Sequence, residues 1–294
     1  MYATLTNMLS EYNCDVAKLI MINYWKLNQV DFKNNNSTAL FLYQTRVYQY
    51  QRKWLDLGLS NIRAIECDNF TYFAVSYDNE LYAWGENAKF DNITEEPKII
   101  LKSIIKVYPH NDFITMINCS HEFFYYELDR LPIANVKEYV YHPFQSSKVI
   151  TYDNQLVDIR LSEDCINNVK SVNSKYILLT NGEISRQDGK IANVKEFKST
   201  KTDLYVLSTN NVLSQLNKCR SFSSDNLIEI IINVKSFSIG QKSVFIVADQ
   251  RYIYDDDGLW PVNYDVIFGQ DAKLIIENNK FTFYGKIFGG QVSF

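Results

Sequence analysis

Residues 73–85 read FAVSYDNELYAWG, an apolar run followed by the polar pair Asp78–Asn79 and then by a run in which apolar and polar residues alternate. Runs that are rich in β-branched and aromatic residues favour strands. Asp and Asn tolerate the positive φ angles that a tight two-residue turn requires. The stretch therefore predicts a β-hairpin.

The same pattern recurs along the chain, each time with a break rich in Asn, Asp or Gly. Five clear copies occupy residues 149–159, 176–185, 204–213, 244–254 and 274–285, and two weaker copies occupy residues 40–50 and 114–126. The sequence therefore predicts eight hairpins with consistent turn chemistry.

A short opener precedes most of these hairpins. The tripeptide Asn-Val-Lys occurs four times, at residues 135–137, 168–170, 193–195 and 233–235. The full set of apolar openers is Ile62, Ile105, Val136, Val169, Val194, Val234 and Val266, spaced 25 to 43 residues apart. Such a spacing is typical of supersecondary units repeated in a solenoid or propeller. A short apolar opener ahead of a hairpin with a more polar outer strand predicts an all-β propeller, in which the opener begins the innermost strand of a four-stranded blade.

The composition agrees with a folded β protein of 294 residues, with 46% hydrophobic and 15% aromatic residues. A net charge of -4 argues against direct nucleic-acid binding, which needs a concentrated excess of Lys and Arg. Five cysteines without a CxxC pair predict reduced thiols, and hence a cytoplasmic or nuclear protein. The N-terminal stretch does not read as a signal peptide, and no apolar run approaches the roughly 20 residues of a membrane span.

The stretch at residues 62–87, IRAIECDNFTYFAVSYDNELYAWGEN, resembles one repeat of the regulator of chromosome condensation family. Residues 82–87, YAWGEN, match the outer-strand motif of that family, FTFYG at residues 281–285 echoes it, and Gly240 stands at the position of the family's opener glycine. The Gly-Gln-Leu-Gly that follows the motif in the family is replaced here by AKFD at residues 88–91. The resemblance extends over residues 38–294.

The resemblance implies a single propeller domain over residues 38–294, preceded by a segment, residues 1–37, that caps the domain or closes it. The periodicity of residues 6–27 leaves a capping helix and a closing strand both open. Seven openers and eight hairpins leave the number of blades at seven or eight, and the resemblance favours seven. The resemblance also implies that Trp84 packs between neighbouring sheets and that Gly85 permits close backbone approach.

The sequence shows no set of residues for catalysis, a cofactor or a metal. The three histidines, His110, His121 and His142, fall in different repeats without metal-ligand spacing. Phosphate-binding loops and nucleophile motifs are absent, and only 10 glycines are present. We therefore predict no enzymatic activity and no cofactor.

The most concentrated polar feature is Asp255, Asp256 and Asp257, followed by Gly258 and Trp260. Three carboxylates beside an exposed Trp form a candidate partner-binding site for a basic surface. Two alternatives remain open: a solvated loop with Trp260 packed between blades, and a calcium loop, which lacks the bidentate Glu of that motif.

Taken together, these features predict a non-catalytic scaffold that presents loops to a protein partner, either a small GTPase or a basic protein, without binding nucleic acid directly. Two other functions are implied by the resemblance. The first is guanine-nucleotide exchange on a Ran-type GTPase, and the second is an adaptor role on chromatin or histones. The acidic charge favours contact with histones over contact with DNA.

Overall fold

The structure is a computed structural model. It describes residues 29–34, 38–50, 53–68, 71–85, 93–110, 113–126, 133–140, 147–159, 165–173, 176–186, 189–200, 203–217, 222–240, 243–268, 272–278, 280–285 and 290–293. The chain forms two compact units, residues 1–112 and 113–294. The interval 6–27, for which a helix or a strand was left open, lies outside the described residues.

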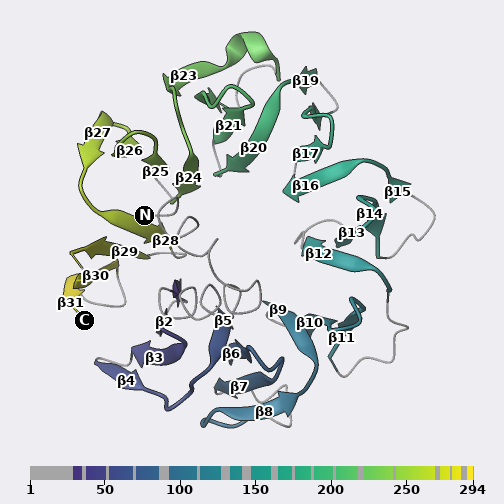
Figure 1. Cartoon of the computed structure of the whole chain (residues 1–294), viewed down its shortest axis with the longest axis vertical. Helices are drawn as coiled ribbons and strands as arrows, with labels where there is room; N and C mark the ends of the chain where they lie inside the picture. The colour runs from purple at the N-terminus through teal and green to yellow at the C-terminus, as the bar shows by residue number, and fades with distance from the viewer. Residues whose placement is uncertain are drawn as a thin grey trace, which may run out of the picture. The chain divides into compact units, whose positions relative to one another are not determined.

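The first unit contains two antiparallel four-stranded sheets, each built from consecutive strands (Figure 1). The first sheet comprises β1 (Val30–Asn34), β2 (Ala39–Tyr43), β3 (Arg46–Tyr50) and β4 (Trp54–Asp56). The second comprises β5 (Ile62–Cys67), β6 (Thr71–Ser76), β7 (Leu81–Gly85) and β8 (Lys98–Leu101), and β9 (Ile104–His110) follows it.

The second unit begins with β10 (Phe113–Asn118) paired with β11 (Phe123–Tyr125) and continues with five four-stranded sheets. The sheets are β12 (Val136–Val140), β13 (Lys148–Thr151), β14 (Leu156–Asp158) and β15 (Cys165–Ile166); β16 (Val169–Asn173), β17 (Tyr176–Leu179), β18 (Ile184–Arg186) and β19 (Gly189–Ile191); β20 (Val194–Ser199), β21 (Asp203–Ser208), β22 (Leu213–Asn217) and β23 (Ile228–Ile231); β24 (Ser236–Ile239), β25 (Val244–Val247), β26 (Arg251–Asp255) and β27 (Gly258–Val262); and β28 (Asp265–Phe268), β29 (Ala272–Glu277), β30 (Lys280–Gly285) and β31 (Gly290–Ser293). A 3₁₀ turn, η1 (Ser224–Asn226), precedes β23.

The predicted all-β propeller class is confirmed. Seven of the eight predicted hairpins pair the second and third strands of a four-stranded sheet, the eighth forms the pair of β10 and β11, and each opener lies at or near the start of a first strand. The described strands form eight sheets, so the blade number is the eight that the hairpin count allowed and not the seven that the resemblance favoured.

The repeated Asn-Val-Lys has a specific local structure. Its Asn adopts a left-handed backbone conformation, with φ of 61° at Asn135, 61° at Asn168, 60° at Asn193 and 59° at Asn233. Asn is one of the few residues that adopt this conformation at low cost. The Val that follows is almost fully buried in each case.

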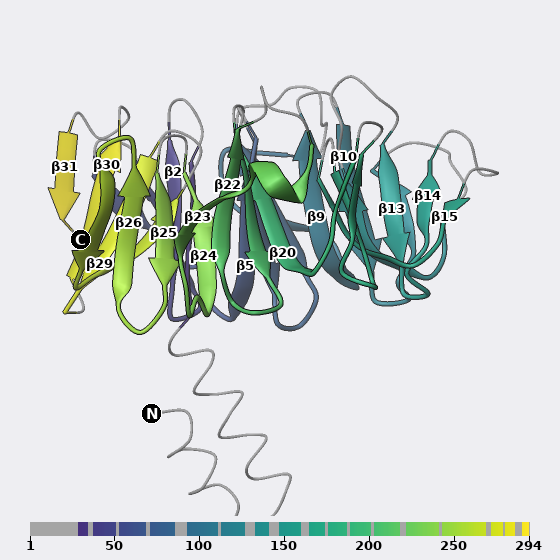
Figure 2. The same cartoon turned by 90° about the horizontal axis from the view of Figure 1, so that it is seen from above.

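The buried Val also connects its sheet to the preceding one. In the second unit, the Val194 N–H donates to the carbonyl oxygen of Gly182, and the Val234 N–H donates to that of Asn211. Gly182 and Asn211 are the positive-φ residues of the preceding hairpin turns. The openers and these turns therefore share one face of the unit, here called the opener face (Figure 2). The described turn between β26 and β27 lies at the opposite end of its strands, on the side here called the loop face.

One turn departs from this pattern. At Asp249–Gln250 neither residue has a positive φ, because the Ala248 N–H bonds to the Gln250 carbonyl oxygen in a tighter connection. In the hairpin of the second sheet, by comparison, the Ser76 N–H bonds to the Glu80 carbonyl oxygen around a positive-φ Asn79.

Large side chains pack between successive sheets, as the resemblance implied for Trp84. Trp84 is 1% exposed and lies in one cluster with Leu40 and Leu42 of the preceding sheet and with Ile65 of its own sheet. Gly85 has a φ of 133°, a conformation that residues with a side chain rarely adopt. Gly240 lies against the ring of Phe268, where an added Cβ would come within 2.6 Å of the ring.

Candidate functional site

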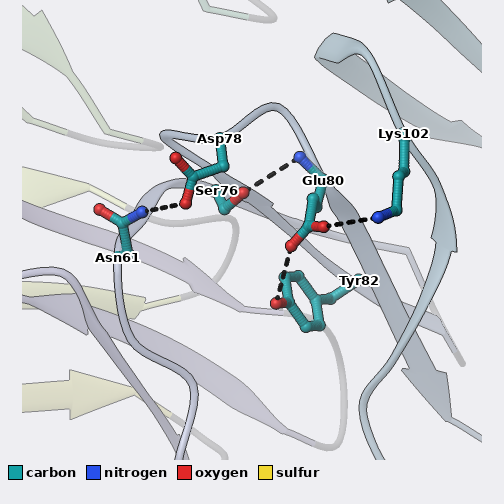
Figure 3. Close-up of polar contacts among 6 residues, drawn as sticks. All are labelled: Asn61, Ser76, Asp78, Glu80, Tyr82 and Lys102. Carbon is teal, nitrogen blue, oxygen red and sulfur yellow. Dashed lines mark hydrogen bonds and ion pairs between the residues drawn. The ribbon is translucent and has the colours of Figure 1, made fainter.

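The polar side chains of the most family-like segment are used in holding its turn together (Figure 3). Asn61 Nδ2 donates to Asp78 Oδ2 at 2.6 Å, and the Glu80 N–H donates to Ser76 Oγ at 3.0 Å. The carboxylate of Glu80 also pairs with Lys102 at 3.3 Å. These partners join the opener to the turn and the third strand to the fourth, so this segment has a structural role.

The predicted acidic site forms the turn between β26 and β27, where β26 ends at Asp255 and β27 begins at Gly258. Asp255 Oδ1 accepts a hydrogen bond of 3.0 Å from the Asp257 N–H, which fixes the turn locally. Asp256 and Asp257 are exposed, and no described residue forms an ion pair with any of the three carboxylates. The turn lies on the loop face because it joins a third strand to a fourth.

Trp260 lies on β27, the edge strand of its sheet, and is 53% exposed. It is therefore not packed between blades, which was one of the alternatives left open. Trp260 is directly opposite Ile253, which packs with Val266 of the following sheet. Its neighbour Leu259 instead packs with the preceding sheet. The side chain of Trp260 therefore lies on the side of β27 that faces away from the preceding sheet.

Beside the acidic turn, three polar residues connect two successive sheets of the second unit. Gln215 Nε2 on β22 donates to Asp203 Oδ1 on β21 at 3.0 Å. The hydroxyl of Tyr254 on β26 donates to Gln215 Oε1 at 2.8 Å. The amide of Gln215 therefore bridges the carboxylate of its own sheet to the tyrosine that leads directly into the acidic turn.

The pKa values of two tyrosines at this junction, Tyr205 and Tyr254, reflect burial and nearby negative charge. Burial raises the pKa of Tyr205 to about 12, and the negative charges of Asp203 and Asp256 contribute to the shift. Burial and the same two carboxylates also raise the pKa of Tyr254. Both hydroxyls thus stay protonated at neutral pH, and Asp256 is close enough to act electrostatically on both rings. Asp203, Gln215 and Tyr254 carry no local motif, and only the packing of neighbouring sheets brings them together.

The histidines and cysteines of the described residues do not form a chemical centre. Burial lowers the pKa of His110 to about 4, so its imidazole is neutral at physiological pH. His121 takes the positive-φ position of its hairpin turn, and its ring packs edge-on against Tyr152 at 4.6 Å between centroids. Burial is also the main cause that raises the pKa of the Cys67 thiol to about 12, so this thiol is a poor nucleophile. Within the described ranges no three His, Cys, Asp or Glu side chains converge as metal ligands; His142 lies outside these ranges.

In the described part of the chain, no helix has the length and apolar character needed to cross a membrane.

No family model matches this chain, and no curated protein matches it in sequence. Among solved structures, BamB from Moraxella catarrhalis is similar, with a TM-score of 0.55 and 10% identity over 90% of this chain and 93% of that one. Prp20p from Saccharomyces cerevisiae, whose structure is described with its binding to Gsp1p and histones, has a TM-score of 0.48 and 12% identity over 82% of this chain and 80% of that one. The similarity to BamB supports the propeller fold and no particular activity.

Proposed function

We propose that this chain is a non-catalytic, cytoplasmic or nuclear interaction module that presents the acidic turn Asp255–Asp257 and the neighbouring Trp260 to a basic protein partner. The observation that carries the proposal is the exposure of this turn: two exposed carboxylates and a half-exposed Trp stand on an edge of the same sheet. Aromatic anchors flanked by charge are typical of protein interfaces. Opposite charges accelerate association when the two surfaces meet.

We also propose that the chain is a divergent member of the regulator of chromosome condensation repeat family. Two features support this relationship, namely the buried Trp84 between sheets and the positive φ of Gly85 that follows it. The eight sheets differ from the seven blades of the family. The proposed relationship therefore concerns the structure of the repeat alone and implies no particular binding partner.

The test replaces all three aspartates by asparagine, which keeps the side-chain oxygen that accepts the Asp257 N–H. A partner is first isolated on immobilised wild-type protein from native extract, then purified, and its association rate is measured at several salt concentrations. We expect the variant to associate more slowly, with the largest difference at low salt, where screening is weak.

The matched control is the triple variant Glu95→Gln, Glu96→Gln and Glu138→Gln, which removes three exposed charges elsewhere. Both variants change the net charge from -4 to -1 (-4 + 3). Equal association rates for the two variants would show that only the overall charge matters, and the acidic turn would then not be the binding site.

A further inference from the structure

The outer strand β23 leaves two large aliphatic side chains in solvent. Ile228 is 51% exposed and Ile232, directly after the strand, is 53% exposed. The strand reads IEII and pairs with β22 on one side only. An exposed aliphatic edge with unpaired N–H and C=O groups is a template for another strand, and proteins usually protect such edges.

Three other fourth strands of the second unit are protected in recognisable ways, whereas β31 has four residues and no Pro, as β23 does. β15 has two residues and β19 has three, so each offers few backbone groups. β27 carries Pro261, which has no N–H to donate to an added strand. β23 has neither device, and its one charged residue is Glu229.

The position of β23 places its exposed edge beside the acidic turn. Ile228 is directly opposite Gln215, whose side-chain oxygen accepts a hydrogen bond from the Tyr254 hydroxyl. Ile230 and Ile231 pack in one cluster with Leu259 of β27. The Ile228 end of β23 therefore lies beside the loop-face end of the next sheet, and these two ends form one surface.

At the loop-face end the charges of the described residues have one sign. The carboxylates are Asp225 on η1, Glu229 on β23, Asp203 on β21 and Asp255, Asp256 and Asp257 in the turn. Arg251, at the other end of β26, is paired with Asp265 at 2.6 Å. An acidic, aliphatic strand edge complements an extended segment in which basic and apolar residues alternate.

We propose that β23 accepts an extended, basic segment of a protein partner as a fifth strand of its sheet, with aliphatic side chains against Ile228 and Ile232 and basic side chains toward Glu229 and the acidic turn. This proposal rests on the proposed interaction function and adds to it the binding mode and the charge of the partner segment. Backbone hydrogen bonds supply affinity in this mode, and alternate side chains supply specificity. A second copy of this chain fits poorly, because edge pairing would bring the two acidic surfaces together.

The test uses a fluorescein-labelled octapeptide of alternating Lys and Val on the full chain at low salt. Its controls are the Glu-Val counterpart, the same composition in block order, and a version N-methylated at alternate residues on one edge. We expect the Lys-Val peptide to bind at least tenfold more tightly than all three. Hydrogen exchange should show new protection of the amides of residues 228–231 on binding.

The variants are Ile228→Lys with Ile232→Lys, and Ile228→Thr with Ile232→Thr as a milder pair that retains strand propensity. Both should weaken the peptide at least tenfold. The matched control is Ile99→Lys on β8, an outer strand with a 42% exposed isoleucine but with basic residues, Lys98 and Lys102, at its ends. This substitution should leave binding unchanged.

Three results would overturn the strand-addition proposal: no binding of the Lys-Val peptide, binding that is insensitive to N-methylation or to both isoleucine pairs, or a wild-type dimer in sedimentation that Ile228→Lys dissociates. Peptide binding that is lost in the Asp→Asn triple variant but unaffected by the isoleucine pairs would uphold the acidic turn and reject β23. The reverse result would uphold β23 and reject the turn as the source of affinity.

Discussion

The ammonium group of Lys170 donates a hydrogen bond of 2.7 Å to the backbone carbonyl oxygen of Lys195, the equivalent residue of the next sheet. The strand register shifts between Val169 and Ser171, so Lys170 is the extra residue of a β-bulge. The register also shifts at the openers of β5, β12 and β20. At Lys170 the bulge thus directs the side chain toward the neighbouring sheet, whereas the ammonium group of Lys195 donates to Asn211 Oδ1 of its own sheet.

A similar contact occurs in the first unit with a different side chain. One Nη of Arg63 donates to the carbonyl oxygens of Ile104 at 3.1 Å and Ile105 at 3.0 Å. Arg63 occupies the bulge position of β5, as Lys170 does on β16. Both residues link a bulge to the start of a later first strand.

Lys170→Met is expected to lower the free energy of unfolding slightly, by under about 1 kcal/mol, because the side chain is exposed and water replaces the lost donor to the Lys195 carbonyl oxygen. Lys235→Met is the control, since Lys235 follows the same Asn-Val but makes no hydrogen bond or ion pair through its side chain with a described residue. Urea unfolding measures both. A larger loss for Lys235→Met would show that the contact to Lys195 contributes nothing.

Asn168→Ala is expected to cost about 1–2 kcal/mol of unfolding free energy, because Ala pays the steric penalty of the left-handed conformation. Asn168→Gly should cost only a few tenths, since Gly adopts positive φ readily. Urea midpoints of the two variants give the comparison. If Ala and Gly behaved alike, the left-handed conformation would not be the reason for Asn in the repeated tripeptide.

The sequence was sufficient to predict the hairpins, because each is encoded locally by a polar break between apolar runs. The openers were predicted for the same reason, except that Ile104, and not Ile105, is the buried residue that begins β9. The sheet of β1 to β4 was harder to assign. Its first strand, Val30–Asn34, reads VDFKN and lacks the opener pattern, so the sequence left the blade number at seven or eight.

The candidate site was predicted only in the part that is contiguous in sequence. The turn at Asp255–Asp257 follows from a run of aspartates before a Gly. Gln215 and Tyr254, by contrast, meet across two sheets, and Ile228 becomes exposed only because β23 is the last strand of its sheet. Such relationships depend on the order and packing of the sheets, which no local pattern encodes.

Acid is expected to destabilise the first unit through His110. Burial lowers the pKa of His110 to about 4 in the folded protein, whereas an unfolded His titrates near 6.5. Between these values the unfolded state binds more protons, so the stability contribution is complete above about pH 6.5 and is lost as the pH falls toward about 4. As the pH falls across this range, the free energy of unfolding should decrease more for wild type than for His110→Gln, and parallel pH curves would contradict the assignment.

Nucleotide exchange on a Ran-type GTPase is expected to be absent. Exchange by the founding member of the resembled family uses a protruding β-wedge. Within the described residues, every strand belongs to a sheet and the one additional element is η1. Release of a labelled nucleotide should stay at the background rate. An acceleration of about tenfold, or about 1.4 kcal/mol in the barrier, would make exchange the preferred function.

Trp84 and Gln49 are expected to be energetically coupled across two sheets of the first unit. Trp84 Nε1 donates to Gln49 Oε1 at 2.8 Å, and the two residues are 1% and 4% exposed. Trp84→Phe leaves the Gln49 oxygen buried without this donor, and Gln49→Leu leaves the indole N–H without its acceptor. Each single change should cost about 1–3 kcal/mol for the unpaired polar group, and Trp84→Phe should cost more because volume is also lost.

The double variant Trp84→Phe with Gln49→Leu removes both polar groups together. It should therefore be destabilised by less than the sum of the single variants, with a coupling energy of about 1–2 kcal/mol in a urea-unfolding cycle. The pair Trp84→Phe with Lys235→Met provides a control in which the two sites share no contact. If the first cycle is additive to within about 0.5 kcal/mol, as the control should be, the hydrogen bond does not join the sheets and Trp84 acts through apolar packing alone.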